Sequence, residues 1–152
     1  MTQPSPQPGA SPGPSGPRAG FWVRFAGAFI DGLVIGIPLT VILFGLDTRF
    51  LVRQGIGALA GFAYGVYFIG SGSGQTVGMK LMNIRAIDAD TGGRIDYGRA
   101  VIRHLMSLVS GYACLIGYLW MLWDPERQTW HDKVANTYVV PTSEYPVDSW
   151  PG

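Results

Sequence analysis

The chain has 152 residues, a formal net charge of +1 and only 14% charged side chains. Soluble domains carry about 25% charged residues, and a soluble helix needs charges on its outward face, which the long apolar runs of this chain do not supply. The near-neutral charge and the lack of a basic block with interleaved aromatics exclude nucleic acid as the main partner. The composition therefore indicates an integral membrane protein that resides in the lipid bilayer.

Both ends of the chain are expected to be disordered tails. Residues 1–20 are rich in Pro, Gly and Ser, and such a segment buries too little apolar surface to offset the entropy of ordering. It lacks the charged start and the early apolar stretch of a secretory signal. Residues 141–152 are polar and also lack an apolar run. Residues 21–140 are expected to form one membrane domain.

Three apolar runs of this domain have the length of membrane-crossing helices. The first covers about residues 25–46, which is 22 residues with one charge, Asp31. At about 1.5 Å per residue it is about 33 Å long, enough for a hydrocarbon core of about 30 Å. The second covers about residues 54–70 and the third about residues 101–123. The sequence thus predicts three transmembrane helices.

The polar segment 71–98 is expected to form a small β-hairpin outside the membrane. Residues 81–88 alternate loosely between apolar and polar side chains, the turn signal Asp90–Gly93 follows, and Arg94–Asp96 forms the return. Asp96 is placed to cap the next helix. The predicted fold class is therefore an all-α integral membrane protein with three transmembrane helices, a small extramembrane β-hairpin and a disordered Pro/Gly-rich N-terminal tail.

The end of the domain contains a capping box and a further strand-like segment. Thr129 and Asp132 have the Ser/Thr-x-x-Asp/Glu spacing that opens a helix. Asn136 is suited to the left-handed conformation that ends a helix. Residues 137–140 have strand chemistry and would suit a third strand of the hairpin. Three spans, however, would place them on the opposite side of the membrane.

Asp31 is a carboxylate inside the first apolar run, and Arg24 lies two helical turns before it on nearly the same face. An intramembrane Asp costs about 2.5–3.5 kcal/mol on insertion scales, so it needs a partner or water. A structural ion pair with Arg24, Arg103 or His104 would supply that partner. The alternative is a functional site that binds a cation or a proton, and the sequence leaves both hypotheses open.

A basic group stands at the start of the third run. Arg99 and Arg103 are four residues apart on one helical face, and His104 follows the second arginine. These side chains would suit an anchor at the membrane interface. The alternative is that Arg103 turns inward to meet Asp31.

Glycines repeat at a four-residue spacing on the first two runs, and this spacing lets helix backbones approach closely in lipid. We interpret these glycines as packing surfaces, either within the chain or between copies in an oligomer. The positions are Gly32 and Gly36 on the first run and Gly57, Gly61 and Gly65 on the second.

No catalytic residue, metal site or cofactor is predicted. His131 beside Asp132 provides too few ligands for a zinc site. No Ser or Cys has a spacing that suggests a nucleophilic triad. An enzyme is therefore not expected.

Three ordered motifs resemble the RDD family of small bacterial membrane proteins, which is named for one arginine and two aspartates. The segment Phe21–Asp31 resembles the opening motif of the family, with Arg24 as the arginine and Asp31 as the first aspartate. Gly74–Leu81 resembles the glycine-flanked loop of the family. The first two motifs therefore occur in the family's order.

The third motif lies near the end of the domain. Gln128–Lys133 resembles the closing motif, with Asp132 as the second aspartate. The chain departs from the family at Asn136-Thr137, where the family often has Gly-Thr. The resemblance covers about residues 21–140.

The resemblance implies a class and little mechanism. It implies a multi-pass protein of the cell membrane that takes part in transport of a small ion or solute, with cation/proton exchange suspected. Because three spans are few for a transport path, we expect a homo-oligomer or a partner membrane protein. The alternative function is a non-transporting accessory or scaffold subunit that organises partner proteins.

The distribution of basic residues predicts the orientation. With three spans, the N-terminus and the hairpin share one side with seven Lys and Arg residues, against four on the other side. The positive-inside rule then places the N-terminus in the cytoplasm and the C-terminus outside. If the third run is instead re-entrant, both ends are cytoplasmic.

Overall fold

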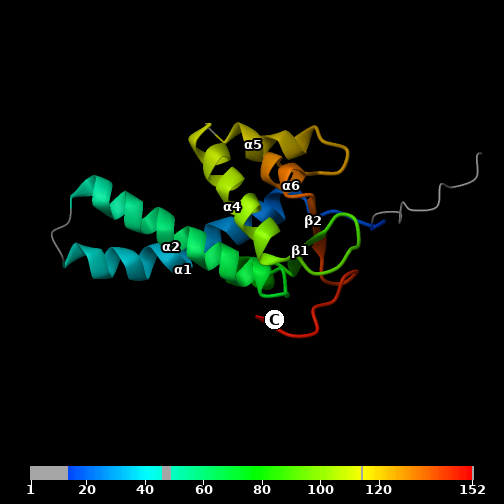
Figure 1. The fold of residues 1–152 in the computed structure, drawn as a ribbon, viewed down its shortest axis with the longest axis horizontal. Coiled ribbons are helices and arrows are strands. Elements are labelled where there is room, and N and C mark those ends of the chain that lie inside the picture. The colour runs from blue at the N-terminus through cyan, green and yellow to red at the C-terminus, as the bar shows by residue number, and fades with distance from the viewer. Residues whose placement is uncertain (1–13, 46–48, 114, 152) are drawn as a thin grey trace, which may run out of the picture.

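The computed structural model describes residues 14–45, 49–113 and 115–151, which form a mostly helical protein with one small sheet (Figure 1). In chain order the elements are α1 (Phe21–Phe44), α2 (Phe50–Gly70), α3 (Val77–Leu81), β1 (Ile84–Asp88), α4 (Tyr97–Tyr112), α5 (Ile116–Leu119), the 3₁₀ turn η1 (Trp120–Leu122), α6 (Trp130–Val134) and β2 (Thr137–Pro141).

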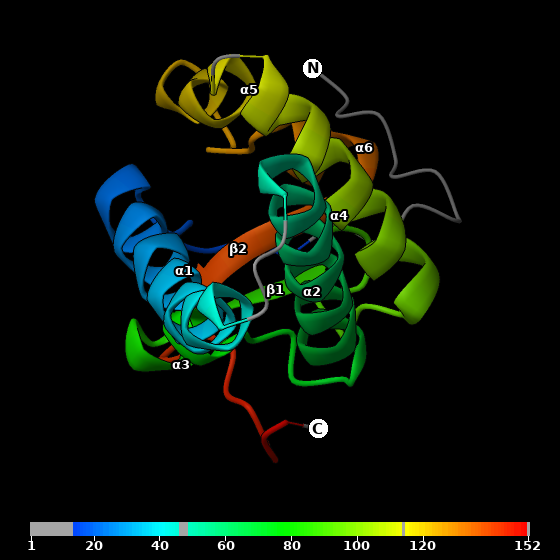
Figure 2. The same ribbon diagram turned by 90° about the vertical axis from the view of Figure 1, so that its left-hand side faces the viewer.

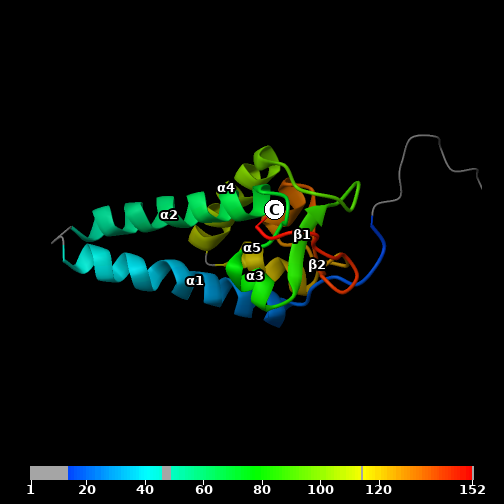
Figure 3. The ribbon, with the colours of Figure 1, turned by 90° about the horizontal axis from the view of Figure 1, so that it is seen from below.

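The helices α1 and α2 form a long hairpin that projects from the rest of the molecule, with its free end far from the sheet (Figures 1 and 3). Within the described ranges, α1 is the one helix that is by itself long and apolar enough to cross a membrane. Its large apolar side chains are exposed, with Phe29 at 60% and Val41 at 71%. Such a surface suits lipid rather than water, so the first predicted span is confirmed as a candidate span.

The second and third predicted spans differ from expectation. The helix α2 is long, with 21 residues, but Arg53, Gln54 and its glycines keep its hydropathy below that of a span on its own. The third apolar run is divided into α4 and α5, which bend by 113° relative to each other. Three transmembrane helices are therefore not confirmed, because α2 is not apolar enough to count as a span by itself and the third run is broken.

Local features turn the chain back after α4. Leu115 has a left-handed φ of 63°, and its N–H donates to the Ser110 carbonyl at 3.1 Å. A Cβ on Gly117 would lie 2.3 Å from Ser110 Oγ, so the missing side chain lets α5 fold closely onto α4. An uncharged run without proline gives no sequence signal for this break.

The sheet pairs strands that are far apart in the sequence. The strand β1 is antiparallel to β2, with Ile84 opposite Pro141. The predicted hairpin within residues 71–98 is therefore wrong, because Arg94–Asp96 forms no strand. Asp96 instead caps α4 as predicted, accepting a hydrogen bond from the Arg99 N–H at 2.9 Å. The strand β2, which is rich in β-branched residues, pairs with β1 in place of the expected return strand.

The sheet lies at one end of the molecule, beside the start of α1 and the end of α2. The Ala19 N–H donates to the Val139 carbonyl at 2.8 Å, so the residues before α1 run beside β2. Ile69 of α2, Ala86 of β1 and Ala100 of α4 share one buried core with Ala19 and Val139. Figure 2 looks along the α1–α2 hairpin from its free end and shows the sheet behind the helices.

The tails were expected to be disordered. Residues 1–13 of the first tail lie outside the described residues, while Arg18 pairs with Glu126 at 2.9 Å. In the second tail, Trp150 stacks on Phe68 with ring centroids 5.3 Å apart and donates to the Gln75 carbonyl at 3.2 Å. The described part of the C-terminal tail therefore rests against the end of α2 and the loop after it.

Candidate functional site

Asp132 is fully buried where α1, α4 and α6 meet. Thr129 and Asp132 form the predicted capping box, in which the Thr129 N–H donates to Asp132 Oδ2 at 3.0 Å. Arg24 Nη2 donates to the same oxygen at 2.5 Å, and Arg103 Nη1 donates to Oδ1. One carboxylate therefore joins three helices.

A threonine of β2 completes this buried ion cluster, which consists of Arg24, Arg103, Thr129, Asp132 and Thr137. Arg103 Nη1 donates to Thr137 Oγ1 at 2.8 Å. The side chains of Arg24 and Arg103 are only 11% and 8% exposed. Charges this far from water are tolerated only when they are paired, and the shared carboxylate provides that pairing.

The charges of the cluster do not cancel. Burial alone would raise the pKa of Asp132, but the guanidinium groups of Arg103 and Arg24 outweigh it and hold the pKa below its usual range. The neighbouring His131 ring packs against Tyr118, and burial lowers the pKa of His131 to about 3. At neutral pH two guanidinium groups therefore share one carboxylate beside a neutral imidazole, which leaves one positive charge in excess.

Asp31 lies two turns further along α1 and is held by a different part of the chain. Its Oδ1 accepts hydrogen bonds from the Tyr64 hydroxyl and the Gly78 N–H, both at 2.7 Å. Its Oδ2 accepts one from Thr76 Oγ1 at 2.5 Å. These bonds fasten α2, α3 and the loop between them to α1.

Close backbone contact makes the Asp31 network possible. A Cβ on Gly78 would lie 2.0 Å from the Gly27 carbonyl oxygen, so the absence of a side chain lets α3 approach α1 and bring its N–H to Asp31. Gly74 has a φ of +68°, and a Cβ there would lie 2.1 Å from the Ala86 carbonyl oxygen. The glycine-flanked loop therefore needs its glycines for packing and for backbone geometry.

The predicted ion pair between Asp31 and Arg24, Arg103 or His104 is wrong. Both arginines bind Asp132, and among the described residues no cationic side chain lies within ion-pair distance of Asp31. The pairing of β1 with β2 draws α6 between α1 and α4, which places the distant aspartate next to the arginines.

The basic residue His104 packs against α2 instead of pairing with an aspartate. A Cβ on Gly65 would lie 2.0 Å from the His104 ring. The Nε2 atom of His104 is buried and has no hydrogen-bond partner among the described residues. Gly65 therefore serves as a packing site for α4, and Gly57 as one for α1, where a Cβ would meet Leu39 at 3.6 Å. No described heavy atom lies within 4 Å of a Cβ built on Gly32, Gly36 or Gly61.

A cavity of about 510 Å³ lies between α1 and the α4–α5 turn, beside the buried ion cluster. Its size falls within the range of about 300–1,000 Å³ that is usual for small-molecule sites. Arg24, Arg103, His131 and Asp31 contribute polar groups to its lining. The apolar lining includes Phe21, Phe25, Phe29, Leu115, Leu119 and Met121.

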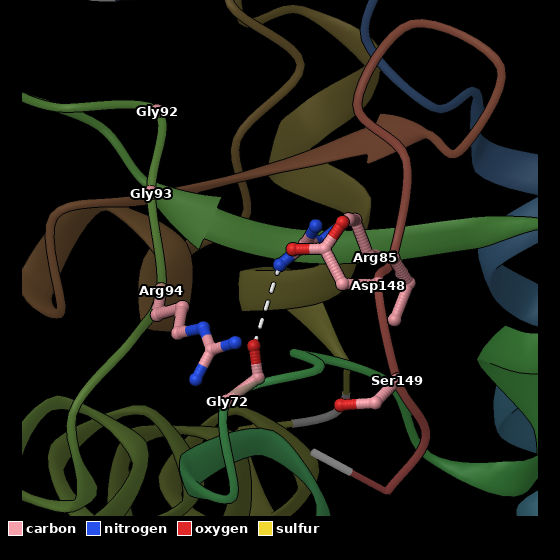
Figure 4. A pocket seen from close by; sticks show the side chains of 8 residues that line it. Gly72, Arg85, Gly92, Gly93, Arg94, Asp148 and Ser149 are labelled. Carbon is pink, nitrogen blue, oxygen red and sulfur yellow. Dashed lines mark hydrogen bonds between the residues drawn. The ribbon is translucent and has the colours of Figure 1, made fainter.

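A second, smaller cavity of about 170 Å³ lies between β1, the loops after α2 and β1, and the C-terminal tail (Figure 4). It is distinct from the ion cluster. Arg85 and Arg94 line it together with Asp148 of the C-terminal tail. Arg85 Nη1 donates to the Pro146 carbonyl at 2.6 Å, and Nη2 donates to the Gly72 carbonyl at 3.4 Å. We assign this cavity to the contact between the tail and the loop.

The sequence located the charged residues of the site but not all of their partners. Thr76 and Gly78 belong to the family-like loop, so a signal for them was present. Thr137 showed only strand propensity, and Tyr64 was one aromatic residue within an apolar run. Neither residue carries a local signal for its hydrogen bond, since both partners come from other elements.

A long apolar helix with exposed side chains, fastened by buried ionic contacts to a small polar layer, defines this chain as a small helical membrane protein. It belongs to the RDD family, whose sequence model matches residues 18–136. From the motif resemblance, we expect Arg24, Asp31 and Asp132 to be the arginine and the two aspartates of the family.

Several bacterial proteins are similar to this chain. It is 31% identical to the Proline-rich antigen of Mycobacterium leprae (strain TN), over 80% of this chain and 60% of the relative. It is 32% identical to the Proline-rich antigen homolog of Mycobacterium tuberculosis (strain ATCC 25618 / H37Rv), over 55% of this chain and 36% of the relative. The chain thus spans less than two thirds of these mycobacterial relatives.

A relative of similar length occurs outside the mycobacteria. The chain is 26% identical to the uncharacterized protein YxaI of Bacillus subtilis (strain 168), over 80% of this chain and 96% of the relative. No solved structure matches the chain.

Proposed function

We propose that α1 and α2 cross the bilayer together and that α4 and α5 enter it and return by the same face. The segment at Ala19 is hydrogen-bonded to β2, and β2 is paired with β1. A bilayer cannot separate hydrogen-bonded strands, so the chain lies on one side before α1, after α2 and after α5. The chain then crosses the bilayer an even number of times between Ala19 and β1, and again between β1 and β2. The bend of 113° between α4 and α5 fits a re-entrant pair.

Basic residues support a cytoplasmic location for the sheet and for both ends of the chain. Nine of the 11 Lys and Arg residues lie at the sheet end or in the first two turns of helices that begin there. Arg49 and Arg53 lie at the free end of the α1–α2 hairpin. Under the positive-inside rule the sheet faces the cytoplasm of a cell-membrane protein, and Arg53 can extend its head group to the opposite interface.

We propose that the cavity serves the transport of a small ion or solute by an oligomer of this chain. The single observation that carries this proposal is the cavity of about 510 Å³, which adjoins charged groups and is walled by the candidate membrane span. Cation/proton exchange at Asp31 has less structural support than transport through the cavity. Three hydrogen-bond donors already occupy this carboxylate, so a cation would have to displace Tyr64, Thr76 or Gly78.

The alternative is a non-transporting accessory subunit that organises partner membrane proteins. It is favoured by Gly32, Gly36 and Gly61, because glycines whose Cβ position meets no described atom within 4 Å allow another helix to approach closely. A homo-oligomer would use the same surface. Transport and assembly are therefore separate questions for experiment.

Ion flux in vesicles tests the transport proposal. Vesicles with purified protein and an enclosed pH-sensitive dye would be given gradients of Na⁺, K⁺ or acetate. Gly111→Leu would narrow the cavity, because Gly111 lines it and a Cβ there meets no described atom within 4 Å. Gly55→Leu is the matched control, since Gly55 is equally open and lies outside the cavity lining.

The expected result is flux in the wild type and in Gly55→Leu, and loss of flux in Gly111→Leu. Flux equal to that of protein-free vesicles for all three gradients would overturn transport of these ions and favour the accessory subunit. Equal flux in the two glycine variants would instead remove the cavity from the path.

A further inference from the structure

The cavity beside the ion cluster has apolar walls and a charged floor. Its walls open toward the surface that faces lipid, because Phe25, Phe29 and Leu115 line it and are 54%, 60% and 56% exposed. The floor lies at the sheet end, where Arg24 and Arg103 meet Asp132. An occupant that satisfies both parts needs an apolar chain and a polar head.

The floor has an excess of positive charge and spare donors. Arg24 and Arg103 share the single carboxylate of Asp132. A guanidinium group has five N–H donors, and Arg103 uses Nη1 for both of its hydrogen bonds. Within the described part of the chain, no hydrogen bond from Nε or Nη2 of Arg103 is found. A carboxylate or phosphate group would accept from these atoms and offset the charge.

Asp31 also lines the cavity, and its carboxylate already accepts hydrogen bonds from the protein. Asp31 lies seven residues after Arg24, which is about 10 Å along the helix. Its two oxygens accept the three hydrogen bonds from Tyr64, Thr76 and Gly78. The charge that meets a head group at the floor is therefore that of the arginines.

The depth of the floor matches that of lipid head groups. Arg24 is the fourth residue of α1 and Arg103 the seventh of α4, and both helices begin at the sheet. At about 1.5 Å per residue, both arginines lie within about 10 Å of the sheet-side helix ends. A bound amphiphile would thus point its head toward the sheet and its chain along Phe25 and Phe29, in the orientation of the surrounding lipids.

We propose that this cavity binds a single-chain lipid with an anionic head group, taken from the leaflet on the sheet side. The arginines hold the head, and the apolar walls from α1 and α5 hold one acyl chain. The inference rests on the proposed functional role of the cavity, but binding does not require that the ligand crosses the membrane. The cavity of about 510 Å³ lies between two helical walls, so the proposal is for one chain, that of a fatty acid, and not for a two-chain phospholipid.

Photo-cross-linking tests this proposal. The purified protein in detergent would be illuminated with a palmitate analogue that carries a diazirine in the chain and an alkyne for detection. Expected labelling lies on α1 near Phe25 and on α5. Unlabelled palmitate should compete, while hexadecanol, which lacks the charge, and a diacyl phosphatidylglycerol should compete about tenfold less well, a loss of about 1.4 kcal/mol.

Two glycine variants serve as the matched pair for this measurement. Gly111→Leu should reduce the labelling about tenfold, whereas Gly55→Leu should label as the wild type does. Equal labelling of the two variants, or equal competition by hexadecanol, would overturn the proposal. Competition by phosphatidylglycerol as strong as by palmitate would overturn the single-chain form, and contacts between two copies across the cavity without labelling would assign it to an oligomer interface.

The binding and flux experiments test the two proposals separately. Labelling without flux would defeat transport and leave the lipid site intact. Flux without specific labelling would defeat the lipid site and leave transport intact.

Discussion

Arg24 on α1 and Asp132 on α6 are 108 residues apart in the sequence, and their side chains meet at 2.5 Å. This contact ties the start of the membrane domain to its last helix. Arg103 approaches the same carboxylate from α4, so the three helices depend on one buried anion. The arrangement indicates that Arg24 and Asp132 help to hold these helices together beside the cavity.

Removing the charge of Asp132 should destabilise the protein strongly. Asp132→Asn leaves two nearly buried guanidinium groups without their counter-charge, and breaking such a pair costs about 3–5 kcal/mol. Thermal unfolding in detergent would measure the effect. Glu126→Gln is the control, because Glu126 is 52% exposed in its pair with Arg18, and exposed pairs contribute about 0–1 kcal/mol. Equal melting of the two variants would refute a structural role for the cluster.

The close approach of α3 to α1 predicts a second large effect. Gly78→Ala places a Cβ 2.0 Å from the Gly27 carbonyl oxygen, so the backbones must separate and weaken the bond to Asp31. Overpacking of this kind costs about 1–3 kcal/mol. Gly61→Ala is the control, since its Cβ meets no described atom and Ala favours the helix by about 1 kcal/mol. A Gly78→Ala protein as stable as Gly61→Ala would contradict the observed packing.

Local features of the fold were predictable from sequence because their causes are local. The apolar composition of α1, the cap at Asp96 and the capping box at Thr129 depend on residues within a few positions. Asn136 has the predicted left-handed φ, at 52°. Asn tolerates this conformation better than most residues, so α6 can end here without a glycine.

Features that depend on distant partners were not predictable. The strand β1 matched a hairpin pattern, but its partner β2 begins 49 residues after β1 ends. The same pairing brings Asp132 to Arg24 and Arg103, and so decides which aspartate the arginines bind. The turn from α4 to α5 depends on a tight contact of Gly117 with Ser110, which an uncharged run does not reveal.

The strand pairing and the positive-inside rule together predict that the C-terminal tail is cytoplasmic. In a Cys114→Ser background, Ser143→Cys should resist an impermeant thiol reagent in intact cells and react after permeabilisation. Arg49→Cys, at the free end of the α1–α2 hairpin, should react in intact cells and serves as the positive control. Labelling of Ser143→Cys in intact cells would support three crossings, and the paired strands could then not form in the membrane.

Burial of His131 predicts a loss of stability in mild acid. Its folded-state pKa is about 3, whereas an unfolded histidine has a pKa of about 6.5. Below about pH 6.5 the unfolded chain binds a proton that the folded chain does not, so stability is full above this pH and falls as the pH decreases toward 3. Asp132 also has a lowered pKa, but its contribution is lost only near and below the ordinary Asp pKa of about 3.9.

Replacing His131 by an aromatic residue that does not titrate isolates its effect on the pH dependence of stability. His131→Phe keeps an aromatic ring against Tyr118, whose centroid lies 4.9 Å away, and removes the proton site. The free energy of unfolding should then fall less steeply than in the wild type between about pH 6.5 and pH 5, a window above the Asp132 effect. Both proteins retain His104, so the difference in slope reports on His131. Parallel curves over this window would show that the His131 imidazole is accessible to protons in the folded state.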